Sequence, residues 1–299
     1  MLRQKTPRND NAQIITQSPC REDNLILKGN LIVKENLIGS IFFLLALLTP
    51  APAQTLAARQ SSAQSDDQNA KLRRAGELTA DEILEQSDRT RNAWDSYVVR
   101  TQILNYEDGK LTEESNFEVS MKGWDKSLVK FLNADVKGQY LLMLEDVMWM
   151  YMPNTRKPIR ITPLQRLTGN ASNGDVARTR YAQDYAAVLK REVTLDGAGC
   201  YVLELTAKRD GATYHKIDYW VTKEHLQPKK AEIYLSSGKH YKTIFYDAYQ
   251  ETSGKVLLKQ MTLIDRLREG GKTIMRLTSY APQDIPAKYF NKDYLEKLK

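Results

Sequence analysis

The chain has 299 residues, of which 44 are basic and 37 acidic, and its formal net charge is +7 at pH 7. The charges are interspersed without a long run of one sign, which excludes the charge pattern of a nucleic-acid-binding protein. Of the two cysteines, Cys20 precedes the cleavage site described below, so Cys200 stands alone in the mature chain and forms no intramolecular disulfide. In the segment CYVLELTA we expect Cys200 to be a buried strand residue.

An apolar stretch near the N-terminus has the features of a signal peptide. Leu37–Leu48 (LIGSIFFLLALL) is uncharged, Lys34 stands before it, and TPAPAQ follows with Ala51 and Ala53 at the small positions of a cleavage site. The apolar stretch is shorter than the about 20 residues that span a bilayer. We therefore expect export and cleavage after Ala53, with an uncleaved membrane anchor as the alternative.

The composition divides the chain into four segments. The segment before the signal peptide is longer than an ordinary basic n-region, and no methionine occurs between Met1 and Met121. It is therefore interpreted as an N-terminal extension or as the product of a misplaced translation start. The segment after the cleavage site is rich in Gln, Ser and Ala without an apolar period, which predicts a flexible tether. The four segments are the extension 1–33, the signal peptide 34–53, the tether 54–77 and a single domain 78–299.

The domain begins with one predicted helix and continues with strands. Thr79 and Glu82 form a capping-box pattern at the start of TADEILEQSD. From Ser96 onward the apolar residues recur with period two, and Asp108–Gly109 is the turn signal of a hairpin. Around eleven strands at short spacing predict an α+β domain, mainly antiparallel β, with one strongly curved sheet or open barrel. The expected strands after the hairpin are KSLVKFLNA, QYLLMLE, VMWMYMP, the edge strand KPIRITP, KREVTLD, CYVLELTAKRD, TYHKIDYWVTK, KKAEIYLSS, KTIFYDAYQE, VLLKQMTLIDRLR and TIMRLTSYA.

Two further segments interrupt or end the strand pattern. Leu167–Leu189 begins as a Gly/Asn/Ser-rich loop and ends in a helix-compatible run, which predicts a lid or a mobile loop. The C-terminal segment IPAKYFNKDYLEKL has aromatic and leucine residues at the spacing of a short helix. The sequence therefore predicts three helical pieces and one sheet.

The usual catalytic and ligand-binding motifs are missing from the sequence. It contains no nucleophile elbow, no zinc-protease motif, no phosphate-binding loop and no Cys-x-x-Cys. His215, His225 and His240 have no further His or Cys at metal-ligand spacing. We expect no catalytic residue, no metal and no cofactor, and we interpret the chain as a binding protein and not an enzyme.

One stretch, EDVMWMYMP, is apolar on both faces of its predicted strand. Val147, Trp149 and Tyr151 point to one side, and Met148, Met150 and Met152 point to the other. An antiparallel strand with one solvated face alternates apolar and polar residues, and this one does not. Methionine is flexible and suits a variable apolar guest. Two interpretations stay open, ordinary core packing and the lining of an apolar cavity.

The order of three segments resembles a known family. VMWMYMPNTRKPIRI, then SNGDVARTRYAQDY, then IPAKYFNKDYLEKL, after a signal peptide and a TADEIL helix, is similar to the LolA-like periplasmic carriers that sort outer-membrane lipoproteins, and to their extended relatives. The resemblance covers the chain from about Leu78 to the C-terminus. The central insertion and the tether are longer than in the carrier for bulk lipoproteins, which leaves the cargo open.

The resemblance implies a half-open barrel whose concave side is covered by helices that act as a lid over acyl chains. It predicts a periplasmic carrier of lipids or lipoproteins, with an inner-membrane exporter or an outer-membrane acceptor as partner. The alternative is a periplasmic lipid sensor that acts on a membrane regulator. Candidate cavity residues are Leu142, Leu144, Met148, Met150, Met152, Phe245 and Ile264. The basic residues Arg156, Lys157, Arg160 and Arg166 are candidates for a rim that meets lipid head groups, with a solvated turn as the alternative.

Overall fold

The computed structural model describes residues 77–92, 94–155 and 157–298. All of them belong to one of the two units into which the chain divides, Pro50–Lys299. The predicted extension 1–33, the signal peptide 34–53 and all of the tether 54–77 except Glu77 lie outside the described residues.

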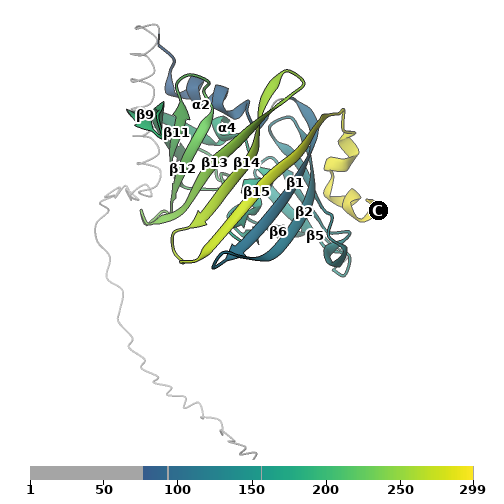
Figure 1. Ribbon diagram of the computed structural model, residues 1–299. Coiled ribbons are helices and arrows are strands. Elements are labelled where there is room, and N and C mark those ends of the chain that lie inside the picture. Colours follow the sequence, from purple (N-terminus) through teal and green to yellow (C-terminus); the bar gives the residue numbers. More distant parts are fainter. Residues whose placement is uncertain (1–76, 93, 156, 299) are drawn as a thin grey trace, which may run out of the picture. The chain divides into compact units, whose positions relative to one another are not determined.

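A thirteen-stranded sheet forms the body of the described unit, and Figure 1 shows its strong curvature. The strand order is β6-β5-β4-β3-β2-β1-β15-β14-β13-β12-β11-β10-β9, and every neighbouring pair is antiparallel. The strands are β1 (Ser96–Glu107), β2 (Lys110–Lys122), β3 (Lys126–Phe131), β4 (Tyr140–Leu144), β5 (Val147–Tyr151), β6 (Ile159–Ile161), β9 (Tyr185–Leu195), β10 (Ala198–Ala207), β11 (Lys216–Thr222), β12 (Pro228–Tyr234), β13 (His240–Thr252), β14 (Lys255–Asp265) and β15 (Gly271–Pro282). The two edge strands, β6 and β9, do not pair with each other, so the sheet is open.

The expected number of about eleven strands was wrong. The main sheet has thirteen, and β7 (Arg166–Thr168) and β8 (Ala171–Ser172) form a second, two-stranded sheet. All thirteen strands of the main sheet overlap segments expected from the sequence, so the number was too low although the segments were right. Only β7 and β8 were not expected, because they are too short to show an alternating pattern. The predicted edge position of KPIRITP is confirmed by β6.

Local signals in the sequence correctly located several element ends. Helix α2 (Ala80–Asp88) begins after Thr79, whose side chain accepts a hydrogen bond from the backbone of Glu82 while the Glu82 carboxylate accepts one from the Thr79 backbone. Asp108 and Gly109 have φ values of +48° and +78°, as the turn between β1 and β2 requires. The capping box and the hairpin turn are therefore confirmed.

The insertion between β6 and β9 lies against the inner face of the sheet. It contains β7, β8, α3 (Asn173–Ala177) and α4 (Tyr181–Asp184), and it ends where β9 begins at Tyr185. The helix-compatible run predicted up to Leu189 is therefore a strand beyond Asp184. Val176, Ala177 and Tyr181 of the insertion join the inner core cluster.

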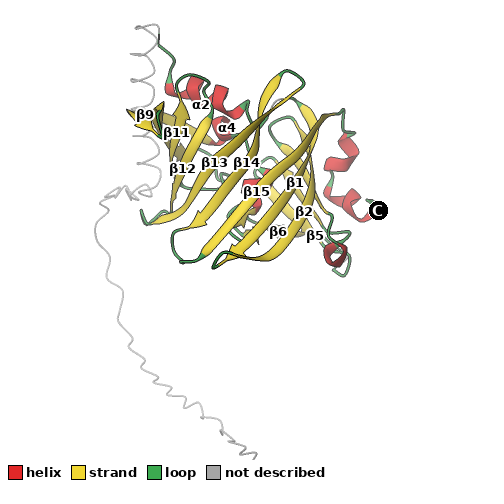
Figure 2. Ribbon diagram, viewed as in Figure 1, coloured by secondary structure: helices red, strands yellow, loops and turns green. Residues whose placement is uncertain are grey.

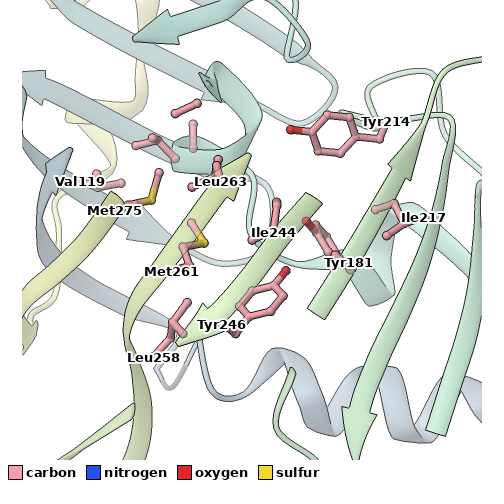
Figure 3. Packing of buried hydrophobic residues seen from close by; sticks show 14 of the residues in the cluster. Val119, Tyr181, Tyr214, Ile217, Ile244, Tyr246, Leu258, Met261, Leu263 and Met275 are labelled. Atoms are coloured by element: carbon pink, nitrogen blue, oxygen red, sulfur yellow. The ribbon is translucent and has the colours of Figure 1, made fainter. Parts of the chain in front are cut away.

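Apolar side chains from nearly every strand meet on the inner face. On β2 the residues Phe117, Val119 and Met121 are buried there, one from every second position. Figure 3 shows Val119, Met261 and Met275 gathered on one side of this cluster and Tyr181 with Tyr246 on another. Helix α2 contributes Ile83 and Leu84 to the same cluster, so the helix and the insertion cover the inner face together.

The C-terminal segment covers the opposite face. Two 3-10 helices, η2 (Ala287–Phe290) and η3 (Lys292–Lys297), lie beside the sheet, as Figure 2 shows in red near the C-terminus. Phe290 and Leu295 pack with Leu142 and Tyr151, and none of these four belongs to the inner cluster. The expectation that all helices cover the concave side was therefore wrong. The chain leaves β15 on the outer side of the sheet and stays there.

The two apolar faces of EDVMWMYMP now have an explanation. Met148 and Met150 pack in the inner cluster, whereas Trp149 and Tyr151 pack with the C-terminal segment on the outer face. Protein covers both faces of β5, so neither face is solvated and the strand does not alternate apolar and polar residues. Cys200 is fully buried with Val202 and Trp220 in a third cluster, which confirms its predicted burial.

Candidate functional site

A pocket of about 550 Å³ opens between the insertion and strands β2, β3, β5 and β6. We call it the insertion pocket. Its volume lies within the range of about 300–1,000 Å³ that is usual for small-molecule sites. The lining residues are Glu113, Glu114, Ser115, Phe117, Phe131, Asn133, Asp135, Val136, Gln139, Met150, Ile161, Gln165, Arg166, Leu167, Thr168 and Asn173.

The pocket has an apolar part in its wall. Phe117 and Phe131 meet edge to face there, with ring centroids 5.1 Å apart, and Met150 and Ile161 add further apolar surface from β5 and β6. Leu167 of β7 adds to this wall from the insertion. An apolar wall of this kind gains free energy when it covers a hydrocarbon chain, because both surfaces leave water.

Three acidic residues and one arginine are among the residues that line the pocket, but the Glu114 carboxylate itself lies with Gln102 and Asn116 on the outer face of β2. Gln102 Nε2 and Asn116 Nδ2 donate hydrogen bonds of 2.9 and 3.1 Å to Glu114 Oε1, and these bonds lower the pKa of Glu114. Glu113 and Asp135 line the same pocket, and Arg166 is its only lysine or arginine among the described residues.

A buried amide in the wall is only half satisfied. Asn173, the first residue of α3, is 3% exposed, and its Nδ2 donates to the Thr162 carbonyl at 3.0 Å. Its Oδ1 is buried and has no hydrogen-bond partner among the described residues. Because Nδ2 is committed to a carbonyl, the free atom is an acceptor. A buried acceptor without a partner costs free energy, so the contact of Asn173 with its surroundings is less stable than a fully hydrogen-bonded one.

The inner face of β2 leads from the insertion pocket to a second, internal cavity. Phe117 lines the pocket, and Val119 and Met121, on the same face, line the cavity. Met261 and Met275 also line it, and we call it the methionine cavity. Its volume is about 30 Å³, space for about two water molecules and far less than an acyl chain needs. Methionine side chains change shape readily, so this part of the core can adapt to small changes in shape.

A buried ion pair fastens the insertion to the sheet. Lys242 Nζ on β13 donates to Asp175 Oδ2 on α3 at 2.7 Å, and Tyr214 Oη donates to Asp175 Oδ1 at 2.7 Å. Burial by itself disfavours the charged carboxylate, but Lys242, Ser172 and Tyr214 together lower the pKa of Asp175 below its ordinary value. Asp175 is therefore ionised and pairs with Lys242 at neutral pH.

A second polar connection lies at the other end of the insertion. Arg178 forms an ion pair with Asp184 of α4 and another, of 3.0 Å, with Asp146 in the β4–β5 turn. Its Nη1 also donates to the Glu145 carbonyl. Arg209 binds Asp146 from the other side at 2.9 Å, and hydrogen bonds from Arg209 and Arg178 lower the pKa of Asp146 against a smaller opposing effect of burial.

A third connection joins α2 to the insertion. Asp88, at the end of α2, accepts hydrogen bonds from Arg91 Nη2 and from the Ala182 backbone, both at 2.8 Å. The Arg91 guanidinium lies 4.2 Å from the centre of the Tyr181 ring. Burial raises the pKa of Asp88, and its partner Arg91 only partly opposes this effect. Polar bonds therefore hold the insertion at three points.

The structure brings together only some of the predicted site residues. Met150 and Arg166 line the insertion pocket, and Met148 is buried beside it in the inner cluster. Leu142 and Leu144 pack on the outer face with the C-terminal segment. Phe245 and Ile264 are half-buried and belong to none of the three apolar clusters of the described residues, and Met152 lies just beyond the end of β5. Lys157 and Arg160 are exposed outside the insertion pocket, and Arg156 lies outside the described residues.

Other pocket residues were missed from the sequence. Met121, Met261 and Met275 occur in strands that alternate normally, so nothing in their own segments distinguishes a cavity wall from a core. Asn173 lies in a stretch that looks like a polar loop. Its burial follows only from the way in which the insertion folds onto the sheet. In β2 and β14 the alternation of apolar and polar residues shows which side chains point inward. It does not show which of these inward side chains border a cavity.

The fold has close counterparts among solved structures. A LolA superfamily protein from Nitrosomonas europaea superposes with a TM-score of 0.69 at 34% sequence identity, over 73% of this chain and 99% of that one. This chain belongs to the LolA superfamily. A family model described only as an uncharacterized protein matches residues 123–297 of this LolA superfamily chain.

Two more distant structures share the fold of this superfamily member. A DUF1329 family protein from Desulfovibrio piger has a TM-score of 0.64 at 22% identity, over 72% of this chain and 97% of that one. An outer-membrane lipoprotein-sorting protein domain from Vibrio parahaemolyticus has a TM-score of 0.62 at 19% identity, over 73% and 98%. The curated proteins contain no match.

The described residues of this LolA superfamily member contain neither a group of metal ligands nor a membrane-spanning helix. Within 77–298, apart from Ala93 and Arg156, no three His, Cys, Asp or Glu side chains are grouped as metal ligands. No helix of the same residues is long and apolar enough to cross a membrane.

Proposed function

We propose that this protein is an exported carrier that binds the acyl chains of lipids or lipoproteins and delivers them toward the outer membrane. The observation that carries the proposal is the continuity of apolar surface from the insertion pocket, along Phe117, Val119 and Met121 of β2, to the methionine cavity. Membership of the LolA superfamily supports it. The head group would stay at the pocket and the chain would follow β2 inward.

Entry of an acyl chain requires the insertion to move. The methionine cavity holds about 30 Å³, so α3 and α4 must shift away from the sheet before a chain fits beneath them. Each buried methylene contributes about 0.8 kcal/mol to the free energy of binding. Burial of about ten methylenes therefore offsets the free energy lost when several polar bonds of the insertion break. Carriage is then reversible, because the same bonds re-form when the chain leaves.

We also propose that the protein acts by binding and not by turnover. None of the three histidines and no cysteine lines the insertion pocket, and Cys200 is buried on the outer face. The Glu114 carboxylate is held by amide donors and stays ionised, which does not suit a general acid. An inner-membrane exporter or an outer-membrane acceptor is the proposed partner, and the periplasm the proposed compartment.

A displacement assay with a fluorescent fatty-acyl probe tests the proposal. Met150→Asp places a charge in the apolar wall of the insertion pocket, and we expect it to weaken probe binding at least tenfold. Ile264→Asp is the matched control, since Ile264 is also a half-buried strand residue but lies outside the pocket and the three clusters. Both variants are first checked for folding by circular dichroism and thermal unfolding.

The outcomes separate the alternatives. Loss of binding in Met150→Asp alone supports the insertion pocket as the site. Loss in Ile264→Asp alone would favour the other face of the sheet. Equal binding by wild type and both folded variants, or no binding by wild type, would refute the proposal.

A further inference from the structure

We propose that one edge of the sheet, residues 157–166, is a docking surface for an anionic membrane. We call it the edge segment, and it consists of the edge strand β6 and the residues on either side of it. The inference rests on the proposed function, because a carrier of acyl chains takes them from a membrane or delivers them to one. A membrane-facing segment is expected to combine cations with exposed apolar side chains beside the binding site.

The charge of the edge segment is entirely positive. It contains Lys157, Arg160 and Arg166, and the sequence has no acidic residue between Asp146 and Asp175. The three basic side chains are exposed, and none of them forms an ion pair with a described residue. They are therefore available to lipid phosphates, and each cation near an anionic bilayer strengthens binding about fivefold.

Two large apolar side chains are exposed among these cations. Ile159 is 46% exposed and Leu164 is 42% exposed. A single exposed apolar residue is ordinary on a protein surface, whereas apolar side chains interleaved with cations are typical of segments that lie on a membrane. Burial of Ile159 and Leu164 at the head-group level would add an apolar contribution to the electrostatic one.

An aromatic residue lies beside the cations on the outer side of β6. Arg160 is the cross-strand partner of Trp149 on β5, and Lys292 Nζ of the C-terminal segment lies 5.1 Å from the centre of the Trp149 ring. The Trp149 side chain is half-buried, so part of the indole reaches solvent between the two cations. Tryptophan is enriched at the membrane–water interface, because its ring is apolar and its N–H is polar.

The edge segment borders the insertion pocket. Ile161, Gln165 and Arg166 line this pocket, and Leu164 adjoins Gln165 in the chain. Alternation along β6 puts Ile159 on the same side of the strand as Ile161. A bilayer in contact with the edge segment would therefore lie next to the pocket through which an acyl chain is proposed to enter.

Vesicle flotation of the protein purified after export tests the proposal. Vesicles of phosphatidylcholine alone are compared with vesicles that also contain the anionic lipid phosphatidylglycerol. We expect the protein to bind the anionic vesicles at least about tenfold more tightly than the neutral ones. Added salt should weaken this binding, because it screens the charges.

Two double variants separate the electrostatic contribution from the apolar one. Lys157→Gln/Arg160→Gln should weaken binding to the anionic vesicles about 25-fold, about fivefold for each cation. Ile159→Thr/Leu164→Ser should weaken it about fivefold and leave its dependence on salt unchanged. All four side chains are exposed, so we expect both variants to fold, as thermal unfolding checks.

The matched control removes two cations elsewhere on the sheet. Arg191 on β9, the opposite edge strand, and Lys259 on β14 are exposed and form no ion pair with a described residue. Arg191→Gln/Lys259→Gln lowers the net charge as much as Lys157→Gln/Arg160→Gln does. We expect the control variant to bind the anionic vesicles nearly as the wild type does. Both charge variants should keep the wild-type affinity for the soluble fluorescent acyl probe.

Each outcome decides one statement. Equal binding of the wild type to neutral and anionic vesicles, or an equal loss in the two charge variants, would overturn the docking surface. Binding of the acyl probe without binding to any vesicle would also overturn it, but would leave the carrier function intact and favour a protein as the docking partner. Binding to anionic vesicles without binding of the acyl probe would support the docking surface and refute the proposed function.

Discussion

Lys242 Nζ and Asp175 Oδ2 lie 2.7 Å apart, and their side chains are only 2% and 1% exposed. One residue belongs to the middle of the sheet, on β13, and the other to the first turn of α3 in the insertion. The pair therefore fixes the insertion over the inner face of the sheet. A charged connection in an apolar core stabilises only one arrangement of its partners, since either charge left alone would be costly.

Replacement of one partner should be strongly destabilising. In Lys242→Met the carboxylate of Asp175 stays buried without its cation, and we expect unfolding free energy to fall by about 3–5 kcal/mol. The measurement is urea unfolding followed by fluorescence. Asp175→Asn/Lys242→Met removes both charges and should recover part of the loss.

An exposed pair provides the comparison for Lys242→Met. Arg100 and Glu118 are 2.7 Å apart on neighbouring strands, with side chains 55% and 28% exposed. Arg100→Met should cost about 0–1 kcal/mol, because water already solvates Glu118. A loss for Lys242→Met as small as that for Arg100→Met would contradict the assigned role of the buried pair.

The same pair should make stability depend on acid pH. The pKa of Asp175 in the folded protein lies below its ordinary value of 3.8, so the unfolded chain binds this proton first as pH falls. The contribution of ionised Asp175 to the free energy of unfolding is therefore fully present above about pH 5. This contribution decreases as pH falls through the pKa of Asp175 in the folded protein. Asp146, whose pKa is also lowered, acts in the same direction, and Asp88, whose pKa is raised, acts in the opposite one.

Comparison with Lys242→Met isolates the contribution of Asp175. Without Lys242, burial favours the neutral carboxyl, so protonation no longer costs the variant stability. We expect the difference in unfolding free energy between wild type and variant to shrink below about pH 4. The unfolding midpoints of both proteins, measured between neutral and acid pH, check this. A difference that stays constant down to the acid limit of folding would be the contrary result.

Arg178 should control how often the insertion opens. Its guanidinium reaches Asp184, Asp146 and the Glu145 carbonyl at once, and the single ammonium of Lys cannot reproduce that geometry. We expect Arg178→Lys to lower the free energy of unfolding by about 1–3 kcal/mol. We also expect amide hydrogen exchange to become faster in residues 173–184 by a larger factor than in β13.

Arg209→Lys is the matched control for the Arg178 prediction. Arg209 pairs with Asp146, and its side chain is 26% exposed. We expect little change in the exchange of residues 173–184 in this variant. Uniform acceleration across the whole sheet in Arg178→Lys would indicate global unfolding and not opening of the insertion.

Substitution by alanine should destabilise the protein to different extents at two glycines with positive φ. Gly169, between β7 and β8, has φ +52°, and a Cβ there would lie 1.8 Å from Asn105 Oδ1. Gly238 has φ +81°, and a Cβ there would meet no atom within 4 Å. Gly238→Ala should cost about 1–2 kcal/mol from the backbone alone. Gly169→Ala should cost about 1–3 kcal/mol more, because Asn105 is buried and must shift. Thermal unfolding of both variants checks the order, and equal losses would contradict it.

The local elements of this protein were predictable from the sequence because their signals are local. The Thr79–Glu82 capping box needs only residues three positions apart, and the Asp108–Gly109 turn needs only two adjacent residues with positive φ. Most long strands were located by their period of two. The strands β7 and β8 were missed, because three and two residues show no such period.

The candidate site was predictable only in part. Met150 and Arg166 were selected for apolar excess and for basic clustering, and both line the insertion pocket. Leu142 was selected on the same grounds as Met150, but neighbouring positions of a strand alternate between its faces, and Leu142 faces the C-terminal segment. Asn173 and Asp175 gave no signal, because a polar residue in a Gly/Asn/Ser-rich stretch is usually solvated.

The sequence by itself determined the sheet-forming segments, the first helix, the hairpin turn and a resemblance that placed the chain in its family. The tertiary structure alone decided which face of each strand meets the insertion and which meets the C-terminal helices. The physical reason lies in the pleat: alternation puts Met148 and Trp149 on opposite sides, but both sides of β5 are covered by protein. Only the packing of residues distant in sequence, such as Asp175 against Lys242 and Tyr151 against the C-terminal segment, distinguishes the two faces.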